Sequence, residues 1–401
     1  MEPWRRNLSV VFAANLLASV GMMGFLPSFP SIVRALGVTG DAAVKVWSGL
    51  LLAGAPVMAA FLGPVWGAIG DRFGRKAMVL RALAGITLFT GAMSLVQRPW
   101  QLLLLRLGQG VLSGYIPPSL TLVSVGAPAD RQGRLAGTLQ SAAFGGAIGG
   151  PLLGGLVLDH FGFRAVFLAC SGLALVAFLL VVAFAVEVDP PSNVRHAPPG
   201  GSSVREALGA ALRDLRATAA DPRLRSLLVA LFSVRFGAAM VEPVLQLVVE
   251  RMEGVDVRYL STITGTAFTA HALANFLSLP AWGRWGDRAG AERVLRLASL
   301  CTGIAFLPQA LAPSWPLLAA LRFVSGLFYA GILASAYGLA AAATGAERRG
   351  AAFGLVFSSL VFAGAVAPIA GGCLAAVLDV RLLFPIGGGL MILAALARRR
   401  R

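Results

Sequence analysis

The sequence carries little charge for its length. Only 13% of its 401 residues are Asp, Glu, Lys or Arg, whereas soluble domains average about 25%. Hydrophobic residues make up 57% of the chain, and the mean hydropathy is +0.78. A water-soluble particle cannot bury so much apolar side chain, because its surface must be largely polar. We therefore predict an integral membrane protein, with lipid as part of its solvent.

Cysteine and histidine are also scarce. Cys170, Cys301 and Cys373 lie inside apolar runs, so they form no disulfide framework and show no metal-ligand spacing. The Gly-rich stretches fall within apolar runs and not after strands, which argues against a nucleotide loop. The net charge of +16 is interspersed with apolar residues, unlike the basic stripe of a nucleic-acid-binding protein. We expect no enzyme activity, no catalytic residues, no metal, no cofactor and no nucleic acid.

Apolar runs of about 20 residues, the length that crosses a bilayer, recur along the whole chain. We predict spans at 9–32, 46–69, 77–96, 100–123, 135–158, 164–186, 224–248, 262–284, 294–312, 315–338, 351–377 and 381–397. The first run has no small-residue cleavage site, so we interpret it as a span and not as a signal peptide. A Pro- and Gly-rich linker at 187–223, with a short amphipathic helix at 204–217, separates domains 1–186 and 224–401.

The distribution of Lys and Arg predicts the orientation. With the N-terminus inside, 24 of the 34 basic residues fall on the inner side and 7 on the outer side. The remaining three, Arg106, Arg235 and Arg322, fall within spans. Because inner loops carry the excess of Lys and Arg, both termini are predicted to be cytoplasmic.

The two halves repeat one another at an offset of 216 residues, which becomes 217 further along. The repeated motifs are Gly67–Gly74 (GAIGDRFG) with Gly283–Gly290 (GRWGDRAG), Arg106-x-x-x-Gly110 with Arg322-x-x-x-Gly326, and Pro151-x-x-Gly154-Gly155 with Pro368-x-x-Gly371-Gly372. Two parallel repeats around a linker are typical of transporters whose halves rock about a midplane site.

Two motifs resemble a known family. Gly67-x-x-x-Asp71-Arg72-x-Gly74-Arg75-Lys76 is similar to the loop signature of the major facilitator superfamily. Gly137-x8-Gly146-x3-Gly150-Pro151-x2-Gly154-Gly155, on the fifth span, matches the antiporter motif of its twelve-span drug:proton exporters. Trp47-Ser48-Gly49 and Arg164-Ala-Val-Phe167 are similar to the bacterial multidrug-resistance G-type exporters.

The resemblance implies an all-α membrane protein of twelve helices in two pseudo-symmetric six-helix bundles. It implies alternating access, with small amphipathic compounds exported in exchange for protons across the cytoplasmic (inner) membrane of a bacterium. The expected partners are this substrate, protons and the lipid bilayer, and we expect a monomer. Two alternatives stay open: a proton-coupled transporter of a specific metabolite, such as a sugar or an amino-acid-like solute, and a non-transporting receptor on the same fold.

The motifs also imply roles for particular residues. The loop signature predicts a latch in which Asp71 and Arg75 gate against span 11 in one state, with Arg72 and Lys76 beside them and Asp287 and Arg288 as a second copy. The alternative is a solvated turn with inner-side charges. Gly146, Gly150 and Gly154 lie on one helix stripe, and the resemblance implies that this stripe packs on span 8. The alternative is a close-packed helix pair without a mechanistic role.

Charges within spans are functional candidates, because burying them in lipid is costly. Glu242 is the only carboxylate placed inside a span, on one face with Arg235 and at a depth similar to Arg106 and Arg322. We hypothesise that Glu242 exchanges protons with its affinity set by a nearby Arg. A structural Arg–Glu pair and selection of cationic substrates are the alternatives. Arg106 also matches the position to which the family assigns a coupling role.

Other polar and aromatic residues are candidates for the substrate cavity. They are Asn15, Met22, Phe25, Gln109, Ser113, Tyr115, Arg322, Tyr329 and Tyr337. For five of them the sequence favours helix packing over a place in the cavity: Asn15, Met22, Phe25, Tyr115 and Tyr337. His271 and Asn275 share a face of span 8, and a lone membrane histidine favours a helix–helix hydrogen bond over a proton relay.

Overall fold

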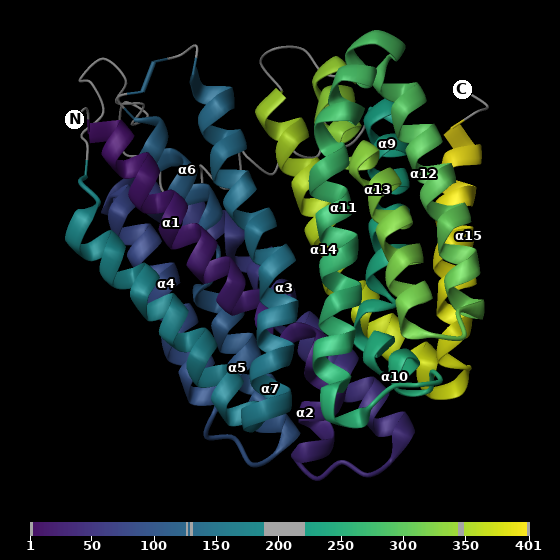
Figure 1. Cartoon of the computed structure of the whole chain (residues 1–401). Helices are drawn as coiled ribbons and strands as arrows, with labels where there is room; N and C mark the ends of the chain where they lie inside the picture. The colour runs from purple at the N-terminus through teal and green to yellow at the C-terminus, as the bar shows by residue number, and fades with distance from the viewer. Residues whose placement is uncertain (1–2, 126, 129–130, 188–220, 344–348, 399–401) are drawn as a thin grey trace.

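A computed structural model describes residues 3–125, 127–128, 131–187, 221–343 and 349–398 (Figure 1). The N-terminal half consists of α1 (Pro3–Gly24), the 3-10 turn η1 (Leu26–Ser28), α2 (Phe29–Ala35), α3 (Asp41–Phe73), α4 (Arg75–Met93), α5 (Pro99–Leu112), α6 (Ile116–Ser124) and α7 (Gln132–Phe184). The predicted linker helix at 204–217 lies outside the described residues.

The C-terminal half repeats this plan. It consists of α9 (Pro222–Ala239), η4 (Glu242–Val244), α10 (Leu245–Glu250), η5 (Val257–Tyr259), α11 (Leu260–Ala289), α12 (Ala291–Phe306), η6 (Leu307–Leu311), α13 (Trp315–Ala343), α14 (Arg349–Val377), η8 (Val380–Leu382) and α15 (Leu383–Ala397). In Figure 1 the two halves stand side by side, with both ends of the described chain at the top.

The helices account for the predicted spans. Within the described residues, nine helical segments are long and apolar enough to cross a membrane. One of them, α7, has 53 residues and would be about 80 Å long if straight. It turns back at Gly162, where φ is 80° and ψ is 175°, so it supplies spans five and six. The α5–α6 pair, broken around Gly114, and the more polar α11 occupy the places of spans four and eight.

Spans one and seven are broken at corresponding places, which the sequence analysis did not predict. The first breaks around Pro27 in η1, and the seventh breaks around Pro243 in η4, 216 residues later. Proline lacks a backbone N–H and its ring clashes with the preceding turn, so it interrupts a helix. Glu242, predicted inside a continuous span, therefore lies at a break between α9 and α10.

The internal repeat is visible in individual contacts. The indole N–H of Trp66 donates to the carbonyl of Val111 at 2.7 Å, and that of Trp282 donates to the carbonyl of Leu327 at 2.6 Å. Each partner is displaced by 216 residues from its counterpart. Gly74 and Gly290, also 216 apart, end α3 and α11 with φ of 90° and 87°. Both halves thus form the same indole–carbonyl hydrogen bond and end the equivalent helix at a glycine with positive φ.

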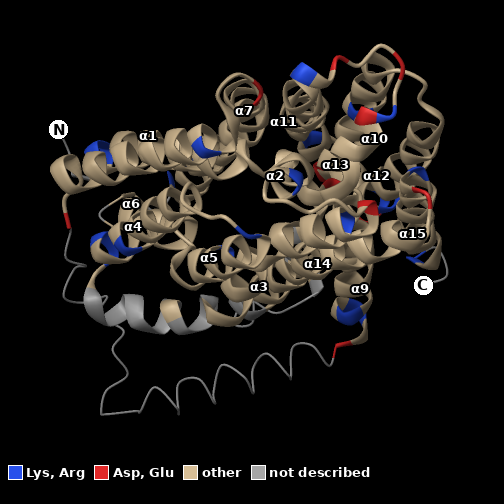
Figure 2. Cartoon of the chain, turned by 90° about the horizontal axis from the view of Figure 1, so that it is seen from below, with Lys and Arg blue, Asp and Glu red and all other residues tan. Residues whose placement is uncertain are grey.

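We name the two ends of the bundle by what they carry. The terminal end holds the start of α1, the end of α7 with Glu187 just after it, the start of α9 and the end of α15. The far end holds the connections 36–40, 94–98 and 251–259 and the turn at Gly162. Seen from the far end, Figure 2 shows Lys, Arg, Asp and Glu gathered mainly at helix ends, with long uncharged ribbon between them.

The halves contact each other through two equivalent helix pairs, α3 with α14 and α7 with α11. A Cβ added at Gly49 would clash with the carbonyl of Pro368, and one added at Gly265 would clash with the carbonyl of Pro151. Gly155 faces Ser261 and Gly372 faces Lys45 in the same way. The helices therefore meet backbone to backbone, and only glycine fits at these positions.

The predicted packing of the glycine stripe on span 8 is wrong. Gly146, Gly150 and Gly154 lie against α1 of the same half, where an added Cβ would meet Ser19, Val20 or Gly24. The next stripe round the helix, Pro151 and Gly155, faces span 8 (α11). One residue of helix turns a side chain by about 100°, so the motif carries two adjacent faces. Gly137 has open space around it.

We expect Gly155→Ala to destabilise the protein by about 1–3 kcal/mol, the usual cost of overpacking. The new methyl group would lie 2.5 Å from the carbonyl oxygen of Ser261. Gly149→Ala is the matched control on the same helix, because its nearest neighbour lies 3.9 Å away. Thermal unfolding of purified protein should show a lower midpoint for Gly155→Ala alone. Equal midpoints for the two variants would contradict this packing.

Candidate functional site

The buried polar centre of the N-terminal half is built around Arg106 on α5. Its side chain is 2% exposed, its Nε donates to the carbonyl of Leu51 at 3.0 Å, and its Nη1 donates to Gln109 Oε1. Gln109 in turn donates to the Thr90 hydroxyl at 2.9 Å. Gly110, one turn after Arg106, lets α3 approach closely enough to present these carbonyls. The charge is thus held by neutral acceptors, without an ion pair among the described residues.

The corresponding centre of the C-terminal half contains an ion pair. Arg235 on α9 donates to the carboxylate of Glu242 at 2.9 Å across the helix break. Tyr329 on α13 is a further partner of Arg235, and its ring centroid lies 5.6 Å from that of His271 on α11. The structure therefore brings together the two residues that were predicted to share a face.

Arg322 on α13 is buried beside this pair without joining it. It is 3% exposed, its guanidinium lies 5.4 Å from the ring centroid of Phe268, and its Nε has no hydrogen-bond partner in the described part of the chain. His271 Nδ1 lies 3.2 Å from both the carbonyl of Arg322 and the hydroxyl of Ser325. This contact between α11 and α13 agrees with the helix–helix role expected for His271.

Of the predicted cavity residues, some pack in the apolar core and others make buried polar contacts. Phe25 is fully buried against Phe29 and Phe167, which is the packing alternative. The hydroxyl groups of Tyr115 and Ser19 form a hydrogen bond of 2.6 Å, which joins the α5–α6 break to α1. The other N-terminal candidates are Asn15, Gln109 and Ser113, which are buried, and Met22, which is half-buried. The side chain of Tyr337 lies outside the described part.

At the far end, one carboxylate of the N-terminal half caps a helix of the other half. Asp159 on α7 accepts hydrogen bonds from the backbone N–H groups of Ser261 and Thr262, at 3.1 and 2.7 Å, and from the Thr262 hydroxyl at 2.7 Å. These N–H groups belong to the first turn of α11, whose N-cap residue Tyr259 has no capping side chain of its own. The first turn of a helix leaves its N–H groups unpaired, so Asp159 satisfies them from across the interface.

Further polar contacts join the halves around this cap. Gln246 Oε1 accepts from the backbone N–H of Ser31 at 3.0 Å. Arg34 pairs with Glu250 at 2.6 Å, and Arg251 pairs with Asp41 at 3.2 Å. Ion pairs that water still reaches, as it does these two, contribute about 0–1 kcal/mol each. We name the Asp159 cap and these three contacts the far-end lock. Because its ion pairs contribute little, we assign most of its strength to the Asp159 cap.

The loop signature makes contacts within its own half. Glu187 accepts from the backbone N–H groups of Arg75 and Lys76 at 2.9 and 2.8 Å, and the Lys76 ammonium donates to the carbonyl of Ala185 at 2.6 Å. The carboxylate thus caps α4, just after Gly74. The side chains of Gly67, Asp71 and Arg72 lie outside the described part, so the latch against span 11 stays a prediction.

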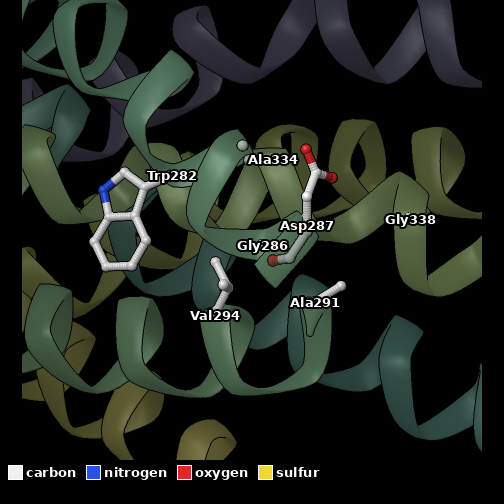
Figure 3. Close-up of a pocket in the computed structure, with 9 residues that line it drawn as sticks. Trp282, Gly286, Asp287, Ala291, Val294, Ala334 and Gly338 are labelled. Atoms are coloured by element: carbon white, nitrogen blue, oxygen red, sulfur yellow. The ribbon is translucent and has the colours of Figure 1, made fainter. Parts of the chain in front are cut away.

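The second copy of the signature borders a pocket. Asp287 and Trp282 of α11, Val294 of α12 and Ser335 of α13 belong to the lining of a pocket of about 170 Å³ at the terminal end. Figure 3 shows Trp282 and Asp287 well separated in it. Arg288 is exposed, like Asp287. At this end the hydrogen bonds of Asn7 with Val186 and of Arg398 with Glu292 each stay within one half.

No sequence motif pointed to Asp159, Gln246 or Glu187. All three lie at span ends, where an acid or amide has an ordinary solvated interpretation. Asp159 follows the antiporter motif by four residues, and only the folded arrangement shows that it reaches another helix. The one signal in the sequence was the position of this carboxylate, about one helical turn after the last glycine of the antiporter motif.

Comparison with known proteins agrees with this architecture. The sequence pattern of the Major Facilitator Superfamily matches residues 11–263 and 227–400. The chain therefore belongs to the major facilitator superfamily, a class of multi-pass membrane transporters and not of enzymes.

Individual proteins are similar to this chain over nearly its whole length, some in sequence and others in structure. The chain is 31% identical over 404 residues to multidrug resistance protein MdtG of Salmonella heidelberg, covering 99% of this chain and 97% of that protein, and the same figures hold for Salmonella typhimurium. A bacterial homologue of the human lysosomal transporter Spinster, inward-facing and unoccupied, has a TM-score of 0.72 at 15% identity, covering 99% and 95% of the two chains. The human organic anion transporter MFSD10 has a TM-score of 0.72 at 21% identity, covering 99% and 100%.

We expect Asp159→Ala to weaken the far-end lock. Loss of a helix cap costs about 0.5–2 kcal/mol, which would raise the far-end-open population about 2- to 30-fold. Spin labels at Thr39 and Val257, exposed far-end positions of opposite halves, should report a longer distance in this variant. The native cysteines are replaced first.

Asp256→Ala is the matched control for this measurement. Asp256 also accepts a far-end backbone N–H bond, from Arg258 at 2.9 Å, but within its own half. Its side-chain hydrogen bond with Arg258 holds the pKa of the Asp256 carboxyl below its usual value, so this variant also removes a negative charge at the far end. A distance change as large in Asp256→Ala would contradict a specific role for Asp159.

Proposed function

We propose that this transporter exports small amphipathic compounds in exchange for protons by alternating access. The multidrug resistance relatives, matched over almost their whole length, support the substrate class. The observation that carries the mechanism is the two-fold repetition of the half–half contacts, in which α3–α14 and α7–α11 meet through glycines. Such paired interfaces let two rigid bundles rock about a central site.

We place the terminal end in the cytoplasm, with a bacterial inner membrane around the bundle. The excess of Lys and Arg at this end supports the orientation. With this orientation, the far-end lock closes the outer side. The protein works as a monomer in this proposal, since each chain holds both halves of the site.

We assign the coupling role to the buried charges. Glu242 lies at a helix break, where a small backbone movement can change its distance from Arg235. Proton uptake by the Glu242 carboxylate would break its ion pair with Arg235 and let the helix break between α9 and α10 rearrange. Protonation would thereby be linked to the outward-facing half of the transport cycle. Arg106, held by neutral carbonyls and Gln109, would tie α5 to α3 during this movement. Because Glu242 is already paired, selection of cationic substrates by this residue is disfavoured.

Glu242→Gln should remove the dependence of transport on a pH gradient. Purified protein in liposomes, loaded with a fluorescent amphipathic dye, is tested with and without an imposed gradient. We expect the gradient-driven flux of the variant to fall to the level of empty liposomes, since glutamine cannot exchange a proton. Glu292→Gln is the control, because Glu292 also pairs with an arginine, Arg398, but within one half and away from the far-end lock.

The same assay separates the alternatives. Unchanged coupling in Glu242→Gln would leave Glu242 as half of a structural pair. Dye binding without flux in the unmodified protein would favour a receptor, and flux of a sugar or an amino acid without flux of dye would favour a metabolite transporter.

Cysteine labelling tests the proposed orientation. In a variant without its native cysteines, Thr39→Cys should react with a membrane-impermeant maleimide added to intact cells. Arg284→Cys, an exposed position near the terminal end of α11, should react only after the membrane is permeabilised, because charged reagents do not cross the hydrocarbon. The reverse pattern would overturn the orientation.

A further inference from the structure

A groove between α9 and α15 opens to the outside of the C-terminal half. It has a volume of about 270 Å³, and its lining includes Arg225, Val229, Ala230, Ala394, Ala397 and Arg398. We name the alanines of its lining, Ala230 of α9 with Ala394 and Ala397 of α15, the alanine floor. Ser226 and Ser233 also line the groove, and its two arginines mark the terminal end. Along α9 the groove runs from residue 225 to residue 233, or about 12 Å. This length is close to the hydrocarbon depth of one leaflet, about 15 Å.

The surroundings of the groove face lipid. Val229 is 60% exposed, and Leu393 and Leu396 of α15 are 64% and 46% exposed. Large apolar side chains exposed on the outside of a membrane-spanning bundle contact acyl chains. The groove therefore lies where a lipid tail can enter it, with the arginines at the level of the headgroups.

The two arginines have spare binding capacity. Arg398 donates through Nε and Nη2 to Glu292, but its Nη1 is buried without a hydrogen-bond partner in the described part of the chain. Arg225 is exposed. The neighbouring acid Asp221 accepts from the backbone N–H of Arg223 at 2.7 Å as the cap of α9. The mouth of the groove therefore holds two arginines, of which Arg398 is paired with Glu292 and keeps one unpartnered N–H donor, Nη1, among the described residues.

We propose that this groove binds an anionic phospholipid, with its phosphate at Arg225 and Arg398 and one acyl chain along the alanine floor. Basic pockets between transmembrane helices suit such headgroups, because a guanidinium both neutralises a phosphate and donates to it. The proposal rests on the placement of the bundle in a membrane but not on transport activity.

Native mass spectrometry of the purified full-length protein tests the proposal. The probes are phosphatidylglycerol and phosphatidylcholine with identical acyl chains. We expect phosphatidylglycerol to be retained preferentially, and Arg225→Gln to lower its affinity about fivefold, the effect of one cation near the membrane surface. Arg284→Gln removes the same charge at the same end, outside the groove, and should change nothing.

A second variant tests the acyl-chain part of the groove. Ala394→Leu fills the floor while both arginines remain, and it should also lower phosphatidylglycerol retention. If this variant does not elute as a monodisperse protein in gel filtration, Ala397→Leu replaces it. Equal retention of the two lipids, or an equal loss in Arg284→Gln, would overturn the proposal. Lipid retention in a protein that moves no dye would refute the proposed export function alone.

Discussion

The close approach of helix backbones between the two halves is the constraint on which the rest of the molecule depends. Pro151 and Pro368 present carbonyls to Gly265 and Gly49, and neither glycine can be enlarged without displacing a helix. Where no large side chains interdigitate between two helices, none has to be withdrawn when the helices separate. Such interfaces can therefore part and re-form as surfaces, which suits a transporter whose halves move as units. The specificity of the closed arrangement then comes from the few polar contacts at the rim.

The polar centres show how such a bundle tolerates charge in lipid. Arg106 is satisfied by backbone carbonyls and an amide, whereas Arg235 is satisfied by a carboxylate at a helix break. The first solution is static, because no partner can be protonated near neutral pH. In the proposed mechanism the second changes with protonation, because a carboxylate can lose its charge. The repeat counterpart of Arg106 is Arg322 and not Arg235, so the C-terminal half adds its ion pair outside the repeated arginine position.

The repeat and the membrane fold could be predicted from the sequence, because hydropathy and equal motif spacing depend only on residue order. Arg235 and Glu242 could be placed on one face, since seven residues make two helical turns. The breaks at Pro27 and Pro243 were missed because prolines also occur inside continuous membrane helices, as Pro151 does. The direction of the glycine stripe was missed because the motif has two small faces, and which neighbour lies on each is a property of the folded bundle.

The cap that Asp159 supplies to α11 has a consequence for the helix itself. When the halves separate at this end, the amides of Ser261 and Thr262 lose their acceptor and must turn to water or to an alternative acceptor. The first turn of α11 would then fray, and its amide protons would exchange faster with solvent. The order of the first turn of α11 thus depends on the position of the other half. Amide exchange at Ser261 and Thr262 would therefore report whether the far end is closed or open during the transport cycle.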